Sequence, residues 1–486
     1  MSGDLPTGWA EVELRECVDV LDNQRIPINS DERAKRQGNV PYYGATGQVG
    51  WIDEALFNEE LLLIGEDGAP FFDKSKPIAY IISGKSWVNN HAHVLRAKSG
   101  ITTNYYLKRF LDQFDFHESV NGTTRLKLTQ AAMNQIPVRL APLAEQKRIV
   151  AKVEKLLEKV DASRARLDKV SALLKRFRQS VLAAACAGRL TADWRIENPA
   201  DTRYDDVVAH IQHRREKQAK TPAQQAKLRD IYSITEEESD ALPDGWGYVA
   251  LSKLCESFDY GTSAKSKPSG KVPVLRMGNI QSGKIDWNDL VYTSDAQEIQ
   301  AYNLKPNTVL FNRTNSPELV GKTSIYLGER PAIFAGYLIR VNHCPELDPS
   351  YLNLCLNTNY ARAFCQSVKT DGVSQSNINA QKLGHFEVPY PPISEQQEIV
   401  RRVEELFALA DRLEARVGKA RGQVDKLTQS ILAKAFRGEL VPQDPNDEPT
   451  EKLLARIRAK NERITAKGDK ATALASVRPG RPRKSR

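Results

Sequence analysis

The chain has 486 residues, 41% hydrophobic and 27% charged, which is enough material for two to four domains with cores of their own. No apolar run approaches the roughly 20 residues that span a bilayer, and the N-terminus lacks the features of a signal peptide, so we expect a cytoplasmic protein without a membrane partner. A net charge of +9 suits a polyanionic partner, although 61 acidic residues dilute the excess. The six cysteines form no C-x-x-C pair, which argues against a zinc site and a disulfide framework.

The chain opens with a motif that returns in its second half. Leu-Pro-Thr-Gly-Trp ends at Trp9, Leu-Pro-Asp-Gly-Trp ends at Trp246, and a strand-like stretch follows each. Between Trp9 and Leu140, apolar or β-branched runs closed by glycine predict short strands and turns, followed by a helix at 105–111. The second half repeats this plan, which predicts two globular segments of one ancestry.

The two segments differ most in their loops. We align 309–311 with 62–64 and 338–340 with 94–96. In this alignment Glu66-Asp67-Gly68 corresponds to Arg313-Thr314-Asn315, and 122–125 corresponds to 372–375. Two similar frames with different loop side chains would present two different recognition surfaces.

A long helix follows each segment. From Pro142 to Leu190, roughly 19 of about 49 positions are identical to those 250 residues further on, which establishes an internal repeat. Apolar residues recur at alternating steps of four and three, the spacing of a coiled-coil seam in which Ser163 is the polar exception. The seam comprises Ile149, Val153, Leu156, Val160, Ser163, Leu167, Val170, Leu174, Phe177 and Val181 in the first copy, and Ile399, Val403, Leu406, Ala410, Leu413, Val417, Ala420, Val424, Leu427 and Ile431 in the second.

The helix ends carry recognisable signals. Ser394 with Gln397 fits a capping box, whereas Ala144 at the equivalent place predicts a start that frays more readily. Gly188 and Gly438 are expected to end the helices. A shorter amphipathic helix should follow each, around 207–211 and 453–457.

The C-terminal residues 466–486 are polar and basic, so we expect them to be disordered. Their Gly-Arg-Pro core is reminiscent of side chains that enter the minor groove of DNA. An unstructured tail that aids solubility is the alternative.

Catalytic motifs are poorly represented. Gly84-Lys85-Ser86 and Gly321-Lys322-Thr323 resemble the end of a P-loop, but both lack its first glycine, and we interpret Gly84 and its counterpart Gly328 as hairpin turns. His91 and His93 have no nearby set of metal ligands in the sequence, which favours a solvated or hydrogen-bonded pair on a strand over a metal site. We therefore expect no enzymatic activity in this chain.

Two stretches carry a resemblance to a known family. Residues 142–150 and 391–400 resemble the P-P-L-x-E-Q-x-x-I-V signature of the specificity subunits of type I restriction–modification systems, and 436–449 resemble that family's distal conserved region. The resemblance covers residues 5 to about 465. It implies that each recognition domain reads one half of a bipartite double-stranded DNA site. It also implies that the conserved regions dock two methyltransferase subunits and, through them, the restriction and motor subunits.

The expected fold class is α+β, with two pseudo-symmetric mixed α/β target recognition domains joined by two long helices in an antiparallel coiled coil. Such helices would hold a recognition domain at each end. The seam from 149 to 181 would span about 48 Å at about 1.5 Å per residue, comparable to one and a half turns of DNA at roughly 34 Å each. The predicted segments are recognition domain 1 (1–141), a central helical region (142–241), recognition domain 2 (242–391), a distal helical region (392–465) and the basic tail (466–486).

The family resemblance implies no cofactor in this chain, since the partner subunits would use S-adenosylmethionine, ATP and Mg²⁺. Candidates for DNA contacts are loop residues able to meet phosphates or base edges. They are Lys35, Arg36, Lys85, Asn89, Asn90, Thr123, Thr124 and Arg125 in the first domain, and Lys265, Lys267, Arg313, Asn315, Lys322, Ser374, Gln375 and Asn377 in the second.

Two other protein classes would each explain part of the sequence. A structural coiled-coil protein would explain the heptads but not the two differently decorated β-rich segments. An ATP-driven nuclease would explain the basic charge, but the incomplete P-loops argue against it.

Overall fold

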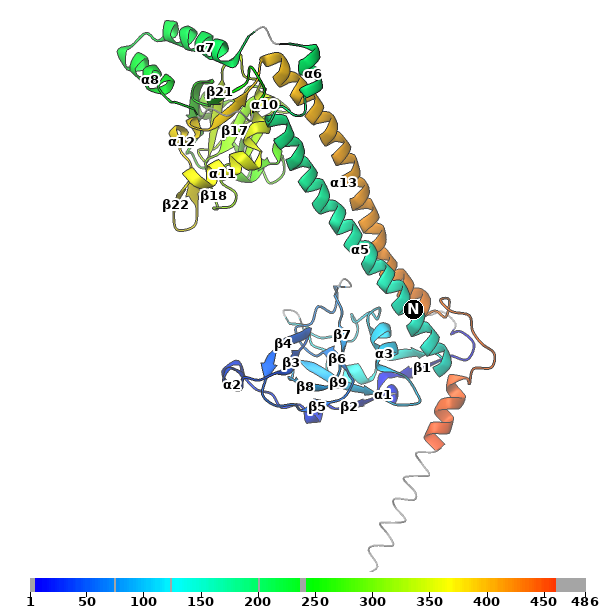
Figure 1. The fold of residues 1–486 in the computed structure, drawn as a ribbon. Coiled ribbons are helices and arrows are strands. Elements are labelled where there is room, and N and C mark those ends of the chain that lie inside the picture. Colours follow the sequence, from blue (N-terminus) through cyan, green and yellow to red (C-terminus); the bar gives the residue numbers. More distant parts are fainter. Residues whose placement is uncertain (1–4, 74–75, 123–124, 200–201, 237–241, 460–486) are drawn as a thin grey trace, which may run out of the picture. The chain divides into compact units, whose positions relative to one another are not determined.

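The computed structural model describes residues 5–73, 76–122, 125–199, 202–236 and 242–459. The chain divides into two compact units, unit 1 with Met1–Leu167 and Lys419–Arg486, and unit 2 with Asp168–Gly418. The division falls inside the two long helices, α5 (Leu143–Cys186) and α13 (Ile393–Ala435) (Figure 1). The boundaries of the five segments expected from the sequence remain a prediction. The tail at 466–486 lies outside the described residues.

Unit 1 contains a domain of mixed strands and short helices. A four-stranded antiparallel sheet lies at its centre, in the order β2 (Val18–Val20), β9 (Ala92–Ala97), β6 (Leu61–Gly65), β7 (Ala79–Ile82). A second sheet has the order β4 (Gly47–Ile52), β3 (Val40–Gly44), β8 (Lys85–Val88), β5 (Phe57–Asn58), and β1 (Ala10–Glu13) pairs with β10 (Pro137–Leu140). The helices are α1 (Leu14–Cys17), η1 (Asp22–Gln24), α2 (Ser30–Lys35), α3 (Asn104–Leu111) and α4 (Gln130–Asn134), and 450–459 are also helical.

Unit 2 repeats this plan with additions. Its main sheet has the order β12 (Cys255–Tyr260), β21 (Leu338–His343), β17 (Thr308–Asn312), β19 (Thr323–Tyr326), β15 (Gly283–Ile285), β14 (Ile280–Gln281). Two three-stranded sheets have the orders β16 (Val291–Thr293), β13 (Val272–Leu275), β20 (Ile333–Phe334) and β18 (Thr314–Asn315), β23 (Ser376–Asn377), β22 (Thr370–Asp371), and β11 (Gly247–Ala250) pairs with β24 (Glu387–Tyr390). The helices are α6 (Ala192–Glu197), α7 (Tyr204–Gln218), α8 (Pro222–Tyr232), η2 (Met277–Asn279), α9 (Ala296–Tyr302), α10 (Pro349–Leu356), α11 (Asn359–Val368) and α12 (Ala380–Gly384).

Strand register corrects one detail of the alignment between the two halves. Val94 pairs with Leu63, and the residue that pairs with the equivalent Leu310 is Arg340. Val94 therefore corresponds to Arg340 and not to Leu338 as the sequence suggested. A shift of two residues leaves every side chain on its expected face, which is why the apolar pattern alone did not reveal it.

Both long helices begin in the same way. Each starts directly after a proline whose carbonyl accepts from the amide of a buried glutamine, Gln146 at 2.9 Å from Pro142 and Gln396 at 3.0 Å from Pro392. The Gln146 side chain also donates to the carbonyls of Ile101 and Ala141, both at 2.9 Å. The predicted capping box is wrong, because helix α13 already begins at Ile393 and Ser394 lies within its first turn.

The two helices pack against each other in an antiparallel register. In unit 1 the Arg164 side chain donates to Asp425 at 2.9 Å, and in unit 2 Arg178 donates to Asp411 at 2.5 Å. Arg178 follows Arg164 by 14 residues and Asp411 precedes Asp425 by 14, so both pairs have one register. Fourteen residues are two heptads, which is the spacing expected of a coiled coil.

The predicted seam is buried in both cores and only in part between them, where Val160, Leu174 and Ala410 are buried but other seam residues are exposed. Ile149 and Val153 belong to the core of unit 1, and Val181, Ile399 and Val403 belong to the core of unit 2. Along the middle of each long helix the cover comes mainly from the other long helix, with a few contacts from unit 2 such as that of Lys284 with Asp411 at 3.7 Å, and a two-helix pair leaves the flanks of its seam to solvent. Four predicted seam residues are consequently exposed, namely Val170 (37%), Phe177 (36%), Leu413 (38%) and Leu427 (47%).

The glycine turns differ from the predicted hairpins. Gly84 has a φ of +76° and lies between β7 and β8, but these strands belong to different sheets. Gly328 similarly connects β19 and β20 in two different sheets. Each turn therefore passes the chain from one sheet to another. Among the residues that the structure describes, no helix is both long and apolar enough to cross a bilayer.

Candidate nucleic-acid interface

The two units build the same loop arrangement beside their central sheets. In unit 1, Lys127 forms isolated bridges with Asp67 and Asn121, and Leu128 donates its amide to the Glu66 carbonyl at 2.7 Å. In unit 2, strands β18, β23 and β22 pair in the corresponding way, and Ile378 donates its amide to the Arg313 carbonyl at 2.9 Å. These matching bonds make Glu66 equivalent to Arg313 and Lys127 equivalent to Asn377.

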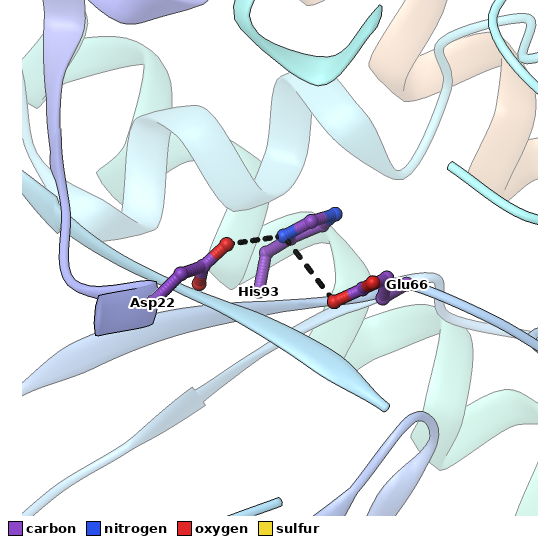
Figure 2. A group of neighbouring side chains, drawn as sticks. All are labelled: Asp22, Glu66 and His93. Carbon is purple, nitrogen blue, oxygen red and sulfur yellow. Dashed lines mark hydrogen bonds and ion pairs between the residues drawn. The ribbon is translucent and has the colours of Figure 1, made fainter. Parts of the chain in front are cut away.

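Unit 1 contains an ionic cluster of Asp22, Glu66 and His93 next to this loop, with the His93 ring bonded to Leu128 (Figure 2). Its histidine, His93, is 1% exposed and is held from both sides: Nε2 donates to the Leu128 carbonyl at 2.9 Å, and Nδ1 lies 2.5 Å from Asp22. Glu66 Oε2 lies 3.7 Å from the same nitrogen. The His93 ring thus joins strand β9 to the end of the 121–128 loop.

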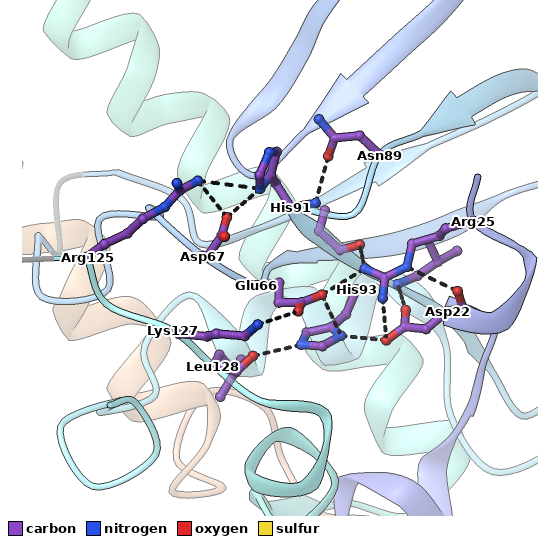
Figure 3. Close-up of polar contacts among 12 residues, drawn as sticks. Asp22, Arg25, Glu66, Asp67, Asn89, His91, His93, Arg125, Lys127 and Leu128 are labelled. Carbon is purple, nitrogen blue, oxygen red and sulfur yellow. Dashed lines mark hydrogen bonds and ion pairs between the residues drawn. The ribbon is translucent and has the colours of Figure 1, made fainter. Parts of the chain in front are cut away.

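Asp22, Glu66 and His93 offer ligand atoms within 4.8 Å of one another, which is close enough for a metal ion. Arg25, however, already pairs with both carboxylates, at 3.4 Å from Asp22 and 2.8 Å from Glu66 (Figure 3). Lys127 adds a second cation, 3.2 Å from Glu66. Two basic side chains therefore balance the two carboxylates, and a bound cation would have to displace Arg25. The cluster fits a structural clamp on the loop better than a metal site.

A second polar group lies at the more exposed edge of the same loop (Figure 3). The Asp67 carboxylate is 2.6 Å from His91 Nδ1 and accepts from Arg125 Nη2 at 3.0 Å. Asn89 fixes the turn, because its side-chain oxygen accepts from the His91 amide at 2.9 Å. The structure thus brings Arg125 and Asn89, two of the predicted contacts, together with Asp67 and His91, which were not among the predicted contacts.

Of the other candidates of the first domain, Asn90 lies in the same turn as Asn89, and Lys35, Arg36 and Lys85 lie elsewhere. Arg36 is engaged within the domain: its guanidinium is 2.8 Å from Asp53 and 3.0 Å from Glu54, and it stacks 4.8 Å from the Trp87 ring. The hydrogen bond with Asp53 raises the Arg36 pKa. Lys35, Lys85 and Asn90 are exposed. Thr123 and Thr124 lie outside the described residues.

In unit 2 the loop brings together a different set of side chains. Arg313 Nη2 donates to the Asn377 side-chain oxygen at 3.2 Å, Nη1 donates to the Gly336 carbonyl at 3.4 Å, and the guanidinium lies 4.6 Å from the centre of the Tyr260 ring. Asn377 in turn donates to the Thr314 hydroxyl at 2.8 Å. Tyr260 was not predicted to take part, since nothing in its local sequence marks it.

The remaining candidates of unit 2 are spread over several elements. Asn315 lies on β18, and Lys322 lies directly before β19, where its ammonium donates to Gln281 at 3.0 Å. Burial, with Arg362 nearby, lowers the Lys322 pKa. Ser374 and Gln375 are exposed in the turn between β22 and β23, and Lys265 and Lys267 are exposed on the loop after β12.

Comparison with known proteins shows which family and which solved structures this chain is similar to. A family model for the type I restriction modification DNA specificity domain matches residues 6–172 and 243–419. The type I restriction enzyme EcoKI specificity subunit of Escherichia coli K12 is 33% identical over 365 residues, covering 72% of this chain and 69% of that protein. The EcoDI specificity subunit of Escherichia coli is 28% identical over 498 residues, covering 97% and 99%. A solved chain from a study of complex assembly and conformational transition of the type I R-M system has the same fold, with a TM-score of 0.62 and 17% identity over 90% of this chain and 100% of that one.

Proposed function

Because the chain belongs to the type I restriction modification DNA specificity family, we propose that each recognition domain reads one half of a bipartite double-stranded DNA target. The chain is a specificity subunit that recognises DNA for the type I restriction–modification system and has no catalytic role of its own. The finer proposal, two domains that each read a half-site, depends on how the two loops compare.

The observation that carries this proposal is one backbone scaffold with two sets of side chains. Glu66 and Arg313 occupy equivalent positions, as do Lys127 and Asn377, while the backbone bonds around them are the same. Base edges are distinguished by their patterns of hydrogen-bond donors and acceptors. Two loops of one shape that present different donors and acceptors would therefore select different base sequences.

We assign the long helices two roles within this proposal. Their antiparallel packing sets the length of the unread gap between the half-sites, and their outward faces dock two methyltransferase subunits, through which restriction subunits join. The chain itself would need no cofactor, whereas the partner subunits would use S-adenosylmethionine, ATP and Mg²⁺. We expect the assembly in the cytoplasm.

Domain exchange tests the proposal. Residues 9–140 are replaced by the equivalent domain of a relative with another target, and methylated sites are sequenced in cells that supply the partner subunits. One half of the site should change and the other half should stay. The reciprocal exchange of residues 246–390 is the matched control and should change the other half. A variant in which both halves change together would contradict the two-reader proposal.

A further inference from the structure

The position directly after the central strand of each domain carries opposite charges in the two units. Glu66 donates its amide to the His91 carbonyl at 2.8 Å, and Arg313 donates its amide to the Tyr337 carbonyl at 2.9 Å. The backbone therefore holds both residues in the same way, and the differences between them come from the surrounding side chains.

In unit 1 this position is fully engaged inside the domain. Strand register makes Asp22 equivalent to Tyr260, since Val20 pairs with Leu95 and the equivalent Phe258 pairs with Val341. The Glu66 side chain is 15% exposed and its carboxylate is shared by Arg25 and Lys127. Its charge is balanced by residues of the chain, so it offers little to an external ligand.

In unit 2 the same position holds a cation without a counter-ion. Arg313 is half-buried, and no ion pair to it occurs within the described part of the chain. Two of its five N–H groups donate to neutral oxygens, those of Asn377 and Gly336, and its buried Nε has no partner among the described residues. The second N–H group on each of Nη1 and Nη2 and the positive charge are therefore left for a ligand, whereas Nε is buried.

The surroundings of Arg313 hold its guanidinium in one orientation. The group lies over the Tyr260 ring, and the Tyr260 hydroxyl is itself fixed by the Ala380 amide at 3.0 Å. Stacking on one face and hydrogen bonds at two nitrogens restrict the rotamers of a side chain that otherwise loses much entropy on binding. Arg313 is thus pre-oriented, whereas a solvated arginine would first have to be ordered.

The strands and the turn next to this arginine carry neutral donors and acceptors, and two lysines near them, Lys369 and Lys382, are engaged within the domain. Asn315, Ser374, Gln375 and Asn377 lie on β18, β23 and the turn before β23, and the acidic Asp371 on β22 is engaged by Lys369. A phosphate-binding surface typically gathers several cations, whereas a fixed guanidinium among amides matches base edges. Guanine presents two coplanar acceptors, O6 and N7, in the major groove, and an arginine fork is their commonest partner.

We infer that Arg313 is a specificity-determining residue that reads a guanine in the half-site of the second recognition domain, with Tyr260 and Asn377 as its positioning residues. The inference rests on the proposed function, because it requires that this loop faces DNA. In the first domain, where the equivalent Glu66 is engaged, the neighbouring group of Asp67, His91 and Arg125 would make the base contacts.

The experiment uses the full chain assembled with its methyltransferase subunits. Binding is measured on duplexes that carry each base substitution in the second half-site, and on duplexes with 7-deazaguanine, which lacks the N7 acceptor. With the wild-type complex, replacement of one particular guanine by adenine should lower the affinity about 10-fold to 100-fold. Replacement of the same guanine by 7-deazaguanine should also weaken binding. The variant R313Q should lose the dependence on this guanine and keep every preference in the first half-site.

The matched control is R330Q, because Arg330 also stacks on an aromatic ring, 4.6 Å from that of Trp287, but lies on the β19–β20 connection. It should keep all base preferences. Equal weakening of every sequence by R313Q would identify a phosphate contact and overturn the inference. The inference would also be overturned if, with the wild-type complex, no 7-deazaguanine replacement in the second half-site weakened binding. This second test does not depend on any variant. A wild-type complex that shows no base preference in either of two half-sites would instead contradict the proposed function.

Discussion

Two glutamates at equivalent positions show how neighbours decide the effect of a buried charge. Glu145 is 1% exposed and Glu395 is 2% exposed, and each accepts from a domain-start tryptophan, at 3.1 Å from Trp9 and 2.9 Å from Trp246. Glu395 also accepts from Arg195 and Thr191, at 3.0 and 2.7 Å. The second oxygen of Glu145 has no partner among the described residues, and burial raises the pKa of this carboxyl group.

We predict opposite effects for the two glutamine substitutions. A raised pKa means that the charged form of Glu145 is disfavoured in the folded state, so its stabilising contribution is present below the ordinary value of 4.5 and is lost as the pH rises through the raised value. E145Q should therefore increase the free energy of unfolding at neutral pH by about 1 kcal/mol, and the gain should vanish in acid. E395Q leaves Arg195 without its carboxylate and should cost about 3 kcal/mol.

Equilibrium unfolding in denaturant at neutral and acidic pH measures both effects. Because the two substitutions are chemically identical and lie at equivalent helix starts, each is the control for the other. A loss of stability in E145Q at neutral pH would show that the Glu145 charge is better compensated than its contacts indicate.

At the scale of elements, the long helices contain glycines with different roles. Gly418 and Gly422 lie within α13, and a Cβ atom added at either would meet no atom within 4 Å. Gly188 follows the end of α5 with a φ of +66°, and a Cβ atom there would lie 2.3 Å from the ring of Pro243. The helix-ending role expected of Gly188 is confirmed, since α5 ends at Cys186.

Alanine substitutions should separate these two kinds of glycine. G418A and G422A should each raise the free energy of unfolding by up to about 1 kcal/mol, because alanine has the higher helix propensity. G188A should lower it by more than about 1 kcal/mol, since the left-handed backbone and the contact with Pro243 both disfavour a side chain. Thermal and denaturant unfolding of the isolated chain provide the measurement. Destabilisation by G418A would indicate that α13 needs a close approach at that point.

At the scale of the whole molecule, lengthening the helix pair tests whether the helices set the length of the unread gap between the half-sites. Seven residues are added to each helix, after Leu167 and after Val417, which keeps the four-three spacing of apolar residues in both. Each helix lengthens by about 10.5 Å, which corresponds to about three base pairs at roughly 3.4 Å per pair. The unread gap should grow by about three base pairs while both half-site sequences survive.

Sequencing of the methylated sites decides the outcome for this variant. Three base pairs also rotate one half-site against the other by roughly 100°, so activity should fall unless DNA or protein twists to follow. A control variant with four residues added to each helix breaks the apolar spacing and should lose specific methylation. An unchanged gap in the seven-residue variant would contradict the role of the helices in setting the distance.

The sequence by itself determined the repeat, the two long helices, the β-rich segments and the family, because each of these is written in residues close together in the chain or in a copy of them. Trp9 and Trp246 mark the two domain starts in the sequence, Glu145 and Glu395 mark the two helix starts, and the structure joins each tryptophan to its glutamate by a hydrogen bond. Local periodicity also located the seam, but it did not show which seam residues are buried.

Only the tertiary structure decided the burial of the seam and the composition of the loops beside the two central sheets. Val170 and Leu427 are exposed because their cover depends on which element packs over each turn of the helix, and no local pattern states this. Asp22 meets His93 across 71 residues, and Tyr260 meets Arg313 across 53, through the order of strands in a sheet. Strand order is set by long-range pairing, so the sequence could name Arg313 as a candidate but could not show that its guanidinium is held ready while that of Arg25 is neutralised.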